Sequence, residues 1–294
     1  MLSKGKTLEG FSSILKSQQT DALEIVATRR RQNTIRFSNS SFHQGLSESD
    51  CKTYIRVVKG RRIGVASTNS LEKGSLKRCL KKAVVIASHT KEEPFSLRLP
   101  GPSPYAQVSS WFESTSEVTD RDKVNILSRG FKKAERNGCL QSGIFRREVG
   151  ELAVVNTNGV EAYHPYTVAH LSVVTTKEES SGLRSAVVKD ISSLDFHPIK
   201  EDSIERCLKG LSPKDIEPGV YRVLFEPHAV SELVRWLSYL GFGAKNLQEG
   251  TSFLSGAIGK RVTGKRVTLY DDGLDLRGMA VPFDMEGIPK KRFP

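Results

Sequence analysis

The chain has 294 residues and a formal net charge of +12, with 37% hydrophobic and 27% charged residues. This length predicts two domains, each large enough to bury a core, and the balance of apolar and charged residues argues against a disordered chain. The longest apolar run, AVVIA at 83–87, is too short to cross a bilayer, and the first residues lack the apolar stretch of a signal peptide, so we expect a cytoplasmic protein with no membrane contact.

The cysteine pattern argues against a zinc ribbon and against a dithiol redox site. The cysteines are far apart and never spaced as C-x-x-C: Cys51, Cys79, Cys139 and Cys207. We expect reduced thiols with mainly structural roles. Cys207 follows Arg206 on an expected polar helix, where a nearby cation could favour the thiolate, but no base is identifiable beside it, so we assign no nucleophile.

The excess of positive charge is largest in the first part of the chain. RRR at 29–31 and KGRR at 59–62 could form a nucleic-acid patch. Both clusters lie in expected strands and turns, without interleaved aromatic residues or a recognition motif. Nucleic acid is therefore the less favoured partner.

The first half of the chain predicts an antiparallel sheet with covering helices. Apolar residues at 8, 11, 14 and 15 have helical spacing, and residues 22–69 alternate as four or five strands, with breaks at Gln32-Asn33, at 47–50 and at Lys59-Gly60. A covering helix is expected within 70–89. Residues 91–107 hold four prolines and a glycine, which predicts a long irregular connection.

The next segment predicts a helix and a tight hairpin. The helix should begin at Thr119 or Asp120 and stop at Gly138, and Asn158-Gly159 should mark the turn between two strands. We therefore expect an α+β domain over 1–190 and a linker over 191–217 that contains a polar helix. A largely β domain should then begin at 218 and run to 294.

The second domain is expected to begin with the strand VYRVLFEP at 220–227, followed by an amphipathic helix. His228 and Glu232 lie four residues apart on one face of this helix, a spacing that metal-protease helices use. No third ligand is evident, so we favour a core helix with a buried stripe of Val230, Leu233, Val234, Leu237 and Leu240. GFGAKN at 241–246 is interpreted as a helix stop rather than a dinucleotide fingerprint.

Several stretches together resemble the TldD/PmbA family, whose older name is modulator of DNA gyrase. They lie in the family order along nearly the whole chain, at 55–69, 154–174, 217–234, 250–262, 267–273 and 281–289. The pair D-D-G and D-x-E-G is the most specific part of the resemblance. Family members continue beyond the D-x-E-G turn with further strands, so we expect the C-terminal domain to be incomplete and partner-dependent.

The resemblance also implies which branch of the family the chain is similar to. In the TldD branch a helix carries H-E-x-x-x-H, which binds a catalytic zinc, but the corresponding places here, 235–240, read R-W-L-S-Y-L. Because these side chains supply neither zinc ligands nor a base, the chain is similar to the PmbA (TldE) branch. We assign no catalytic residue, metal ligand or cofactor to it.

The resemblance therefore implies a non-catalytic subunit that helps bind unfolded peptide for cleavage by a zinc-bearing partner. Its partner would be a TldD-like zinc protease subunit, or the chain would form a homodimer. Its partner or substrate cleft would include four acidic residues, Asp271, Asp272, Asp284 and Glu286. From the residues alone, turn hydrogen bonding is the commoner use of such motifs, and a hard cation is less favoured. The alternative function is a basic DNA- or gyrase-associated regulator.

Two histidines complete the set of candidates. His164 and His170 lie six residues apart on an expected strand, which places both on one face of the sheet. We interpret them as hydrogen-bonded or solvent-facing side chains rather than a ligand pair.

Overall fold

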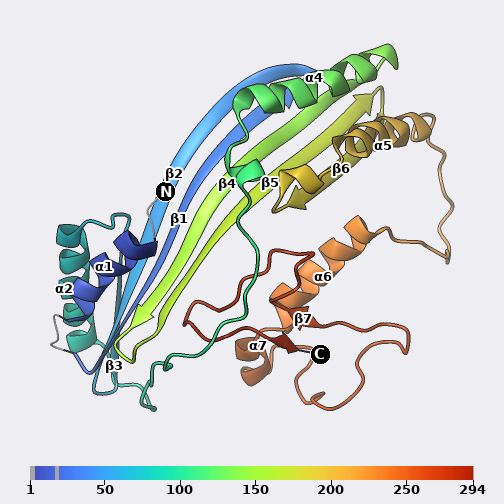
Figure 1. Ribbon diagram of the computed structural model, residues 1–294. Helices are drawn as coiled ribbons and strands as arrows, with labels where there is room; N and C mark the ends of the chain where they lie inside the picture. The colour runs from blue at the N-terminus through green and yellow to red at the C-terminus, as the bar shows by residue number, and fades with distance from the viewer. Residues whose placement is uncertain (1–3, 17–19, 294) are drawn as a thin grey trace. The chain divides into compact units, whose positions relative to one another are not determined.

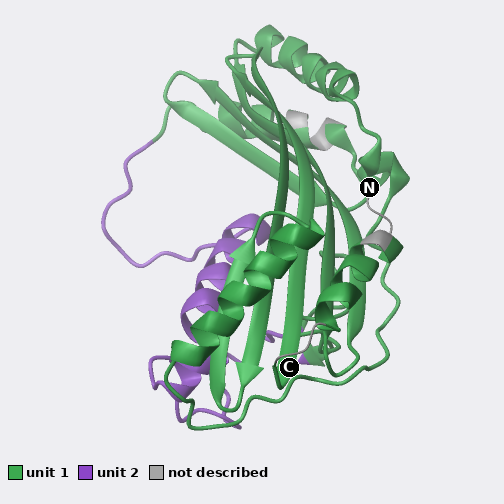
Figure 2. Cartoon of the chain, turned by 90° about the vertical axis from the view of Figure 1, so that its left-hand side faces the viewer, with its two compact units in different colours: residues 1–213, 272–292 green, residues 214–271, 293–294 purple. Residues whose placement is uncertain are grey.

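The computed structural model describes residues 4–16 and 20–293, which divide into two compact units. Unit 1 comprises residues 1–213 and 272–292, and unit 2 comprises residues 214–271 and 293–294 (Figure 2). The domain boundaries expected at 190 and 218 stay predictions, because compact units need not be the segments of the chain that fold separately. Among the described residues, no helix combines the length and the apolar character needed to cross a bilayer.

Unit 1 is built on a six-stranded sheet in the order β3-β2-β1-β4-β5-β6, and every neighbouring pair is antiparallel (Figure 1). Its strands are β1 (Ala22–Ser38), β2 (Ser41–Lys59), β3 (Arg62–Thr68), β4 (Leu140–Asn156), β5 (Glu161–Lys177) and β6 (Ser180–Val188). The expected α+β fold with an antiparallel sheet and covering helices is confirmed.

The helices of unit 1 are α1 (Lys4–Leu15), α2 (Lys73–His89), α3 (Glu113–Ser116), α4 (Asp120–Arg136), the 3-10 helix η1 (Ile191–Ser193) and α5 (Phe196–Lys209). Unit 2 contains α6 (Pro227–Gly241) and α7 (Ala244–Gln248), and the two-residue strands β7 (Asp271–Asp272) and β8 (Arg292–Phe293) lie where the chain passes between the units. Residues 91–112 contain no helix or strand, as the prolines indicate.

The first hairpin corrects the sequence-based strand count. Residues 22–68 form three strands rather than four or five, and the breaks expected at Gln32-Asn33 and at 47–50 are wrong. The chain turns instead at Asn39 and Ser40, whose φ values are +50° and +56°. Two consecutive left-handed residues match the twist of a two-residue hairpin, so β1 and β2 run past the polar positions without interruption. The break at Lys59-Gly60 is confirmed.

The predicted boundaries of α4 and of the β4–β5 hairpin are confirmed. The Thr119 hydroxyl accepts the N–H of Asp122 at 3.2 Å, the Asp122 carboxylate accepts the N–H of Thr119 at 2.9 Å, and this capping box begins the helix. Gly138 follows its end with a φ of +66°. At the hairpin, the side-chain oxygen of Asn156 accepts the N–H groups of Asn158 and Val160.

Unit 1 consists of two similar halves, each with the order helix, three strands, helix. Strands β1 and β4 both have 17 residues, and an offset of 118 relates their first residues, Ala22 and Leu140. The same offset relates Gly64 of β3 to Gly182 of β6. A Cβ on Gly64 would lie 2.1 Å from the Ala83 carbonyl oxygen, and a Cβ on Gly182 would lie 2.2 Å from that of Ser203, so each half packs its last helix directly on a glycine.

The register of the sheet relates the halves by an approximate two-fold axis. Arg31 of β1 lies opposite Val149 of β4, and these two residues are equivalent under the 118-residue offset. Two hydrophobic clusters flank this point on the face of the sheet on which α1, α2, α4 and α5 pack, which we call the helix-bearing face. One cluster joins α1 and α2 to the sheet and the other joins α4 and α5 to it. The centre of that face, around the axis, lies between the clusters.

The predictions for the start of unit 2 are wrong in two respects. Residues 220–225 form no strand, and four of the five residues of the stripe expected to be buried on α6 are exposed, at 41% for Val230, 53% for Leu233, 41% for Leu237 and 60% for Leu240, whereas Val234 is half-buried. Residues 214–270 contain α6 and α7 and no strand. Without a strand in residues 214–270, the backbone of 220–225 has no sheet to pair with, and the apolar face of α6 has no sheet of its own segment to cover.

Candidate functional site

The D-x-E-G motif forms a tight turn that closes against the sheet. The Asp284 carboxylate accepts the N–H groups of Glu286 and Ile288, both at 2.9 Å. Gly287 has a φ of +78°, and a Cβ there would lie 2.6 Å from a methyl carbon of Val160. The Tyr105 hydroxyl donates to the Gly287 carbonyl at 2.7 Å. The motif is therefore a turn whose glycine is required by both backbone conformation and close packing.

Glu286 extends from this turn into an ion-pair network on the sheet. Arg56 Nη2 lies 2.8 Å from Glu286 Oε1 and 2.9 Å from Glu24 Oε1, and Glu24 lies opposite Arg56 in the β1–β2 register. The Glu24 side chain is only 4% exposed. Burial raises the pKa of Glu24, Arg56 partly offsets this effect, and the charges of Glu286 and Asp284 raise the pKa further. Two carboxylates, those of Glu24 and Glu286, thus share one guanidinium.

The D-D-G motif also forms a hydrogen-bonded turn. The Asp272 carboxylate accepts the N–H of Leu274 at 3.0 Å, and its carbonyl accepts the N–H of Asp275 at 3.3 Å. Asp271 belongs to unit 2, whereas Asp272, Asp284 and Glu286 belong to unit 1. The structure brings Asp284 and Glu286 together in one turn, and the role of all four residues in a substrate or partner cleft stays a prediction.

The donor set on α6 does not fit a zinc ion. The six residues 235–240 offer no imidazole, thiolate or carboxylate. Arg235 Nη2 lies 2.7 Å from Glu232 Oε2, so that carboxylate already has a cationic partner, and His228 is exposed at the start of the helix. In the described part of the chain, no group of three or more His, Cys, Asp or Glu side chains could hold a metal ion. The α6 helix ends at Gly241, which confirms the interpretation of GFGAKN as a helix stop.

The two histidines of β5 have structural surroundings. His164 is 4% exposed and its ring contacts that of Phe283 edge-on, with centroids 6.4 Å apart. Burial lowers the pKa of His164 and also that of His170. His170 Nε2 lies 3.1 Å from the Ser185 hydroxyl oxygen. A hydrogen-bonded His170 agrees with the sequence interpretation, and neither histidine belongs to a group of possible metal ligands.

Cys207 is unsuited to nucleophilic chemistry. It is 0% exposed, and its Sγ donates to the Ser180 carbonyl at 3.6 Å. Cys139, also buried, packs in the same hydrophobic cluster. All four cysteines are free thiols.

The structure reveals a cavity that the sequence interpretation missed. It lies at the centre of the helix-bearing face, has a volume of about 330 Å³, and is lined by Arg29, Arg31, Trp111, Ser116, Glu117, Arg147, Val149, Gly150 and Glu151. We call it the central arginine cavity. The RRR sequence at 29–31 was the available signal, but only the pairing of β1 with β4 adds Arg147 and Glu151 to it.

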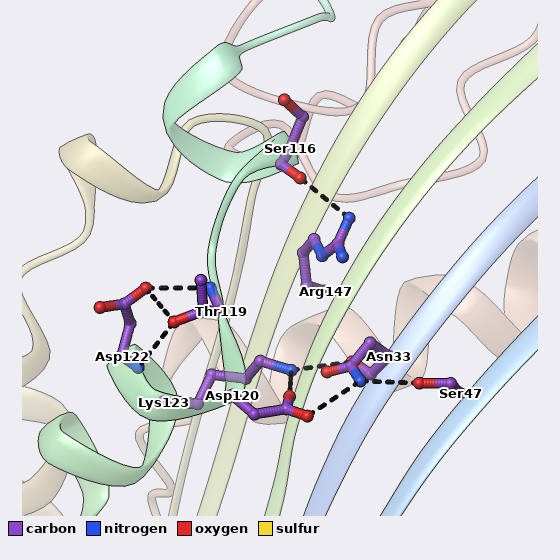
Figure 3. A network of polar contacts seen from close by, with 8 residues as sticks. All are labelled: Asn33, Ser47, Ser116, Thr119, Asp120, Asp122, Lys123 and Arg147. Carbon is purple, nitrogen blue, oxygen red and sulfur yellow. Dashed lines mark hydrogen bonds and ion pairs between the residues drawn. The ribbon is translucent and has the colours of Figure 1, made fainter. Parts of the chain in front are cut away.

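One wall of this cavity is fixed by a polar network at the start of α4 (Figure 3). Arg147 Nη1 donates to the Ser116 carbonyl at 2.9 Å. The Lys123 side chain is 0% exposed and its Nζ lies 2.9 Å from Asp120 Oδ1, and it donates to the Asn33 carbonyl at 3.4 Å. Burial lowers the pKa of Lys123, whereas Asp120 counteracts that effect. The network ties α4 to β1 beside the cavity.

Comparisons with known proteins agree with this architecture. The profile of PmbA/TldA metallopeptidase domain 1 matches residues 23–87, and that of the PmbA/TldA metallopeptidase C-terminal domain matches residues 218–294. The fold and the order of these matches define a protein of the PmbA/TldA metallopeptidase class. The chain belongs to the TldD/PmbA family.

Individual relatives are distant. MJ0231, an uncharacterized protein of Methanocaldococcus jannaschii, is 25% identical over 262 residues, which cover 87% of this chain and 59% of that protein. TM0727 of Thermotoga maritima, described as a putative modulator of a DNA gyrase, has a TM-score of 0.86 at 19% identity. The match covers 99% of this chain and 68% of the TM0727 chain. TldE from Thermococcus kodakarensis has a TM-score of 0.78 at 21% identity, with 99% and 66% covered.

Proposed function

We propose that the chain is a non-catalytic subunit of a TldD/TldE-type metalloprotease complex, which helps hold unfolded peptide for cleavage by a zinc-bearing partner. The observation that carries the proposal is the donor set of α6. The places of the family's zinc motif hold R-W-L-S-Y-L, and the carboxylate of Glu232 on the same helix is paired with Arg235. A catalytic zinc needs three donors and a base for its water, so these functions would come from another chain.

The exposed apolar face of α6 supports a partner-dependent role. Besides the four exposed aliphatic residues of the stripe, Trp236 is 53% and Tyr239 is 76% exposed. A contiguous apolar surface on one helix is typical of a protein interface, and tryptophan and tyrosine are enriched at the centres of such interfaces. The partner in this proposal is a zinc-bearing TldD-like subunit, and a second copy of the chain is the alternative partner.

Co-purification and reconstitution test this proposal. The chain is expressed with a TldD-type protein that carries H-E-x-x-x-H, and hydrolysis of a casein-derived peptide mixture is measured for each protein and for both together. We expect a stable complex and a faster cleavage by the complex than by the zinc-bearing protein alone. Two proteins that neither associate nor change each other's activity would contradict the proposal.

The alternative function, a DNA- or gyrase-associated regulator, is supported by the net charge of +12. Binding through several phosphate contacts weakens steeply as salt rises. Retention of the chain on a DNA column at low salt, with release at moderate salt, would favour this alternative, and no retention at low salt would remove it.

A further inference from the structure

The central arginine cavity lies where the two halves of unit 1 meet. Arg31 and Val149 lie opposite each other on the approximate two-fold axis, and the 118-residue offset relates Arg29 of the first half to Arg147 of the second. Strand alternation places these side chains on one face, because odd-numbered residues of both strands also form the helix-covered clusters. Each half therefore contributes an equivalent arginine to one cavity.

The groups around the cavity leave hydrogen-bonding capacity unused. Within residues 4–16 and 20–293, neither the half-buried Arg29 nor the exposed Arg31 forms a hydrogen bond or ion pair through its guanidinium. Glu151 is 6% exposed, and its Oε2 accepts from the Tyr163 hydroxyl at 2.7 Å, whereas its buried Oε1 has no partner. The Nε of Arg147 is also buried and without a partner. Buried polar atoms of this kind are normally satisfied, so their arrangement around a cavity points to a ligand.

The chemistry of these groups restricts the ligand. Arginine binds carboxylates and phosphates through paired N–H groups, so Arg29, Arg31 and Arg147 favour an anion. The free oxygen of Glu151 needs a hydrogen-bond donor, and its charge disfavours a dianion close by. Trp111 and Val149 provide an apolar wall. A monoanion with a neighbouring N–H and a small apolar group satisfies all three requirements.

We propose that the central arginine cavity binds a free α-carboxylate with its adjacent N–H group, the chemistry shared by an amino acid and by the C-terminal residue of a peptide. The carboxylate lies between Arg29 and Arg147, with Arg31 beside it, and the N–H donates to Glu151 Oε1. The site is formed by unit 1 alone, and it goes beyond the proposed role in a protease complex because it needs neither a partner nor a zinc ion.

Calorimetric titration of the purified chain tests the site. The probes are N-acetyl-trialanine with a free carboxyl group, the same peptide with an amidated C-terminus, free alanine and inorganic phosphate. We expect the free-acid peptide or alanine to bind, the amidated peptide to bind at least about tenfold more weakly, and phosphate to bind more weakly than either acid. Binding of the peptide alone identifies a C-terminus, and binding of alanine alone identifies an amino acid.

Matched substitutions locate the binding. Arg29→Gln removes a guanidinium that has no structural partner and should weaken binding at least about tenfold without lowering the unfolding temperature. Arg147→Gln should have the same effect on binding. Arg30→Gln is the control, because Arg30 lies between two cavity arginines in sequence but points to the other face and pairs with Asp50. The proposal is overturned if neither acid binds, if amidation has no effect, if phosphate binds as tightly, or if Arg30→Gln weakens binding as much as Arg29→Gln.

Discussion

At the residue scale, Lys123 gives a test of the polar network beside the cavity. Its ammonium is fully buried, whereas the Asp120 side chain is 59% exposed. Removing only the carboxylate leaves a buried cation with the Asn33 carbonyl as its remaining partner, which is unfavourable. We expect Asp120→Asn to lower the free energy of unfolding by about 1–2 kcal/mol, after discounting for the solvent exposure of Asp120.

The double variant provides the control for this prediction. Replacement of Lys123 by methionine removes the buried charge and keeps most of the side-chain volume, so Lys123→Met should cost less than Asp120→Asn. In the Lys123→Met background, Asp120→Asn should have almost no further effect in urea denaturation. Equal losses from Asp120→Asn in both backgrounds would show that the ion pair does not stabilise the fold.

Glu24 gives a pH-dependent prediction of defined sign. Burial raises its pKa above the ordinary value, so between that value and the raised one the folded protein binds more protons than the unfolded chain. Its contribution therefore makes stability fall as pH rises through this window. We expect Glu24→Gln to gain stability relative to the native protein as pH rises from the ordinary carboxyl pKa through the raised pKa of Glu24, measured by urea denaturation at several pH values.

Glu92 is the matched control for Glu24. Its exposed carboxylate pairs with Arg61, and this lowers the pKa of Glu92. The pH dependence of Glu92→Gln should therefore have the opposite sign, with stability lost relative to the native protein as pH rises through the acidic range. The same sign for both variants would contradict the assignment of burial as the cause at Glu24.

The sequence predicts local chemistry at this scale and misses long-range chemistry. The turns at Asp272, Asp284 and Asn158-Gly159 could be predicted because the interacting groups lie within four residues of each other. The ion pair of Arg56 with Glu286 could not, because the two residues are 230 positions apart. The same holds for the cavity, which needs the β1–β4 register.

At the element scale, Gly64 and Gly182 are expected to fix the packing of α2 and α5 on the two edge strands. A Cβ at either position would overlap a backbone carbonyl oxygen, which cannot move away without shifting a helix. We expect Gly64→Ala and Gly182→Ala each to lower the free energy of unfolding by about 1–3 kcal/mol or more in urea denaturation.

Gly45 is the control for these two positions. It also lies in a strand, but a Cβ there would meet nothing within 4 Å, so Gly45→Ala should be close to neutral or slightly stabilising. A loss at Gly45 as large as that at Gly64 would show that the close helix contacts do not decide the cost.

The repeat of the two halves illustrates why elements are predicted better than their arrangement. Local sequence signals identify α2, α4 and α5, but they carry no information on the 118-residue offset. Arg29 and Gly64 match their equivalents, whereas most neighbouring residues differ. The strand breaks were misplaced for a related reason. Polar residues inside β1 and β2 pair across the hairpin, whereas the true turn at Asn39 and Ser40 lacks the glycine that usually marks it.

At the scale of the whole molecule, the apolar face of α6 is the expected partner surface. The heptad-like pattern of this helix predicts an apolar stripe, but a pattern cannot tell whether the stripe is buried by the same chain or by another. We expect Leu237→Glu to abolish co-purification with a zinc-bearing TldD-type partner. The unfolding transition of unit 1 should stay unchanged. Ser231→Glu, on the same helix outside the stripe, should leave the association intact. An equal effect of both substitutions would remove α6 from the interface.

The proposed role requires that this chain lack a catalytic metal site of its own. The most direct measurement is the zinc content of the purified chain after dialysis, by plasma mass spectrometry, together with its hydrolysis of peptides in added zinc. We expect far less than one zinc per chain and no metal-dependent cleavage. One zinc per chain, lost together with peptide hydrolysis on His228→Ala, would contradict it.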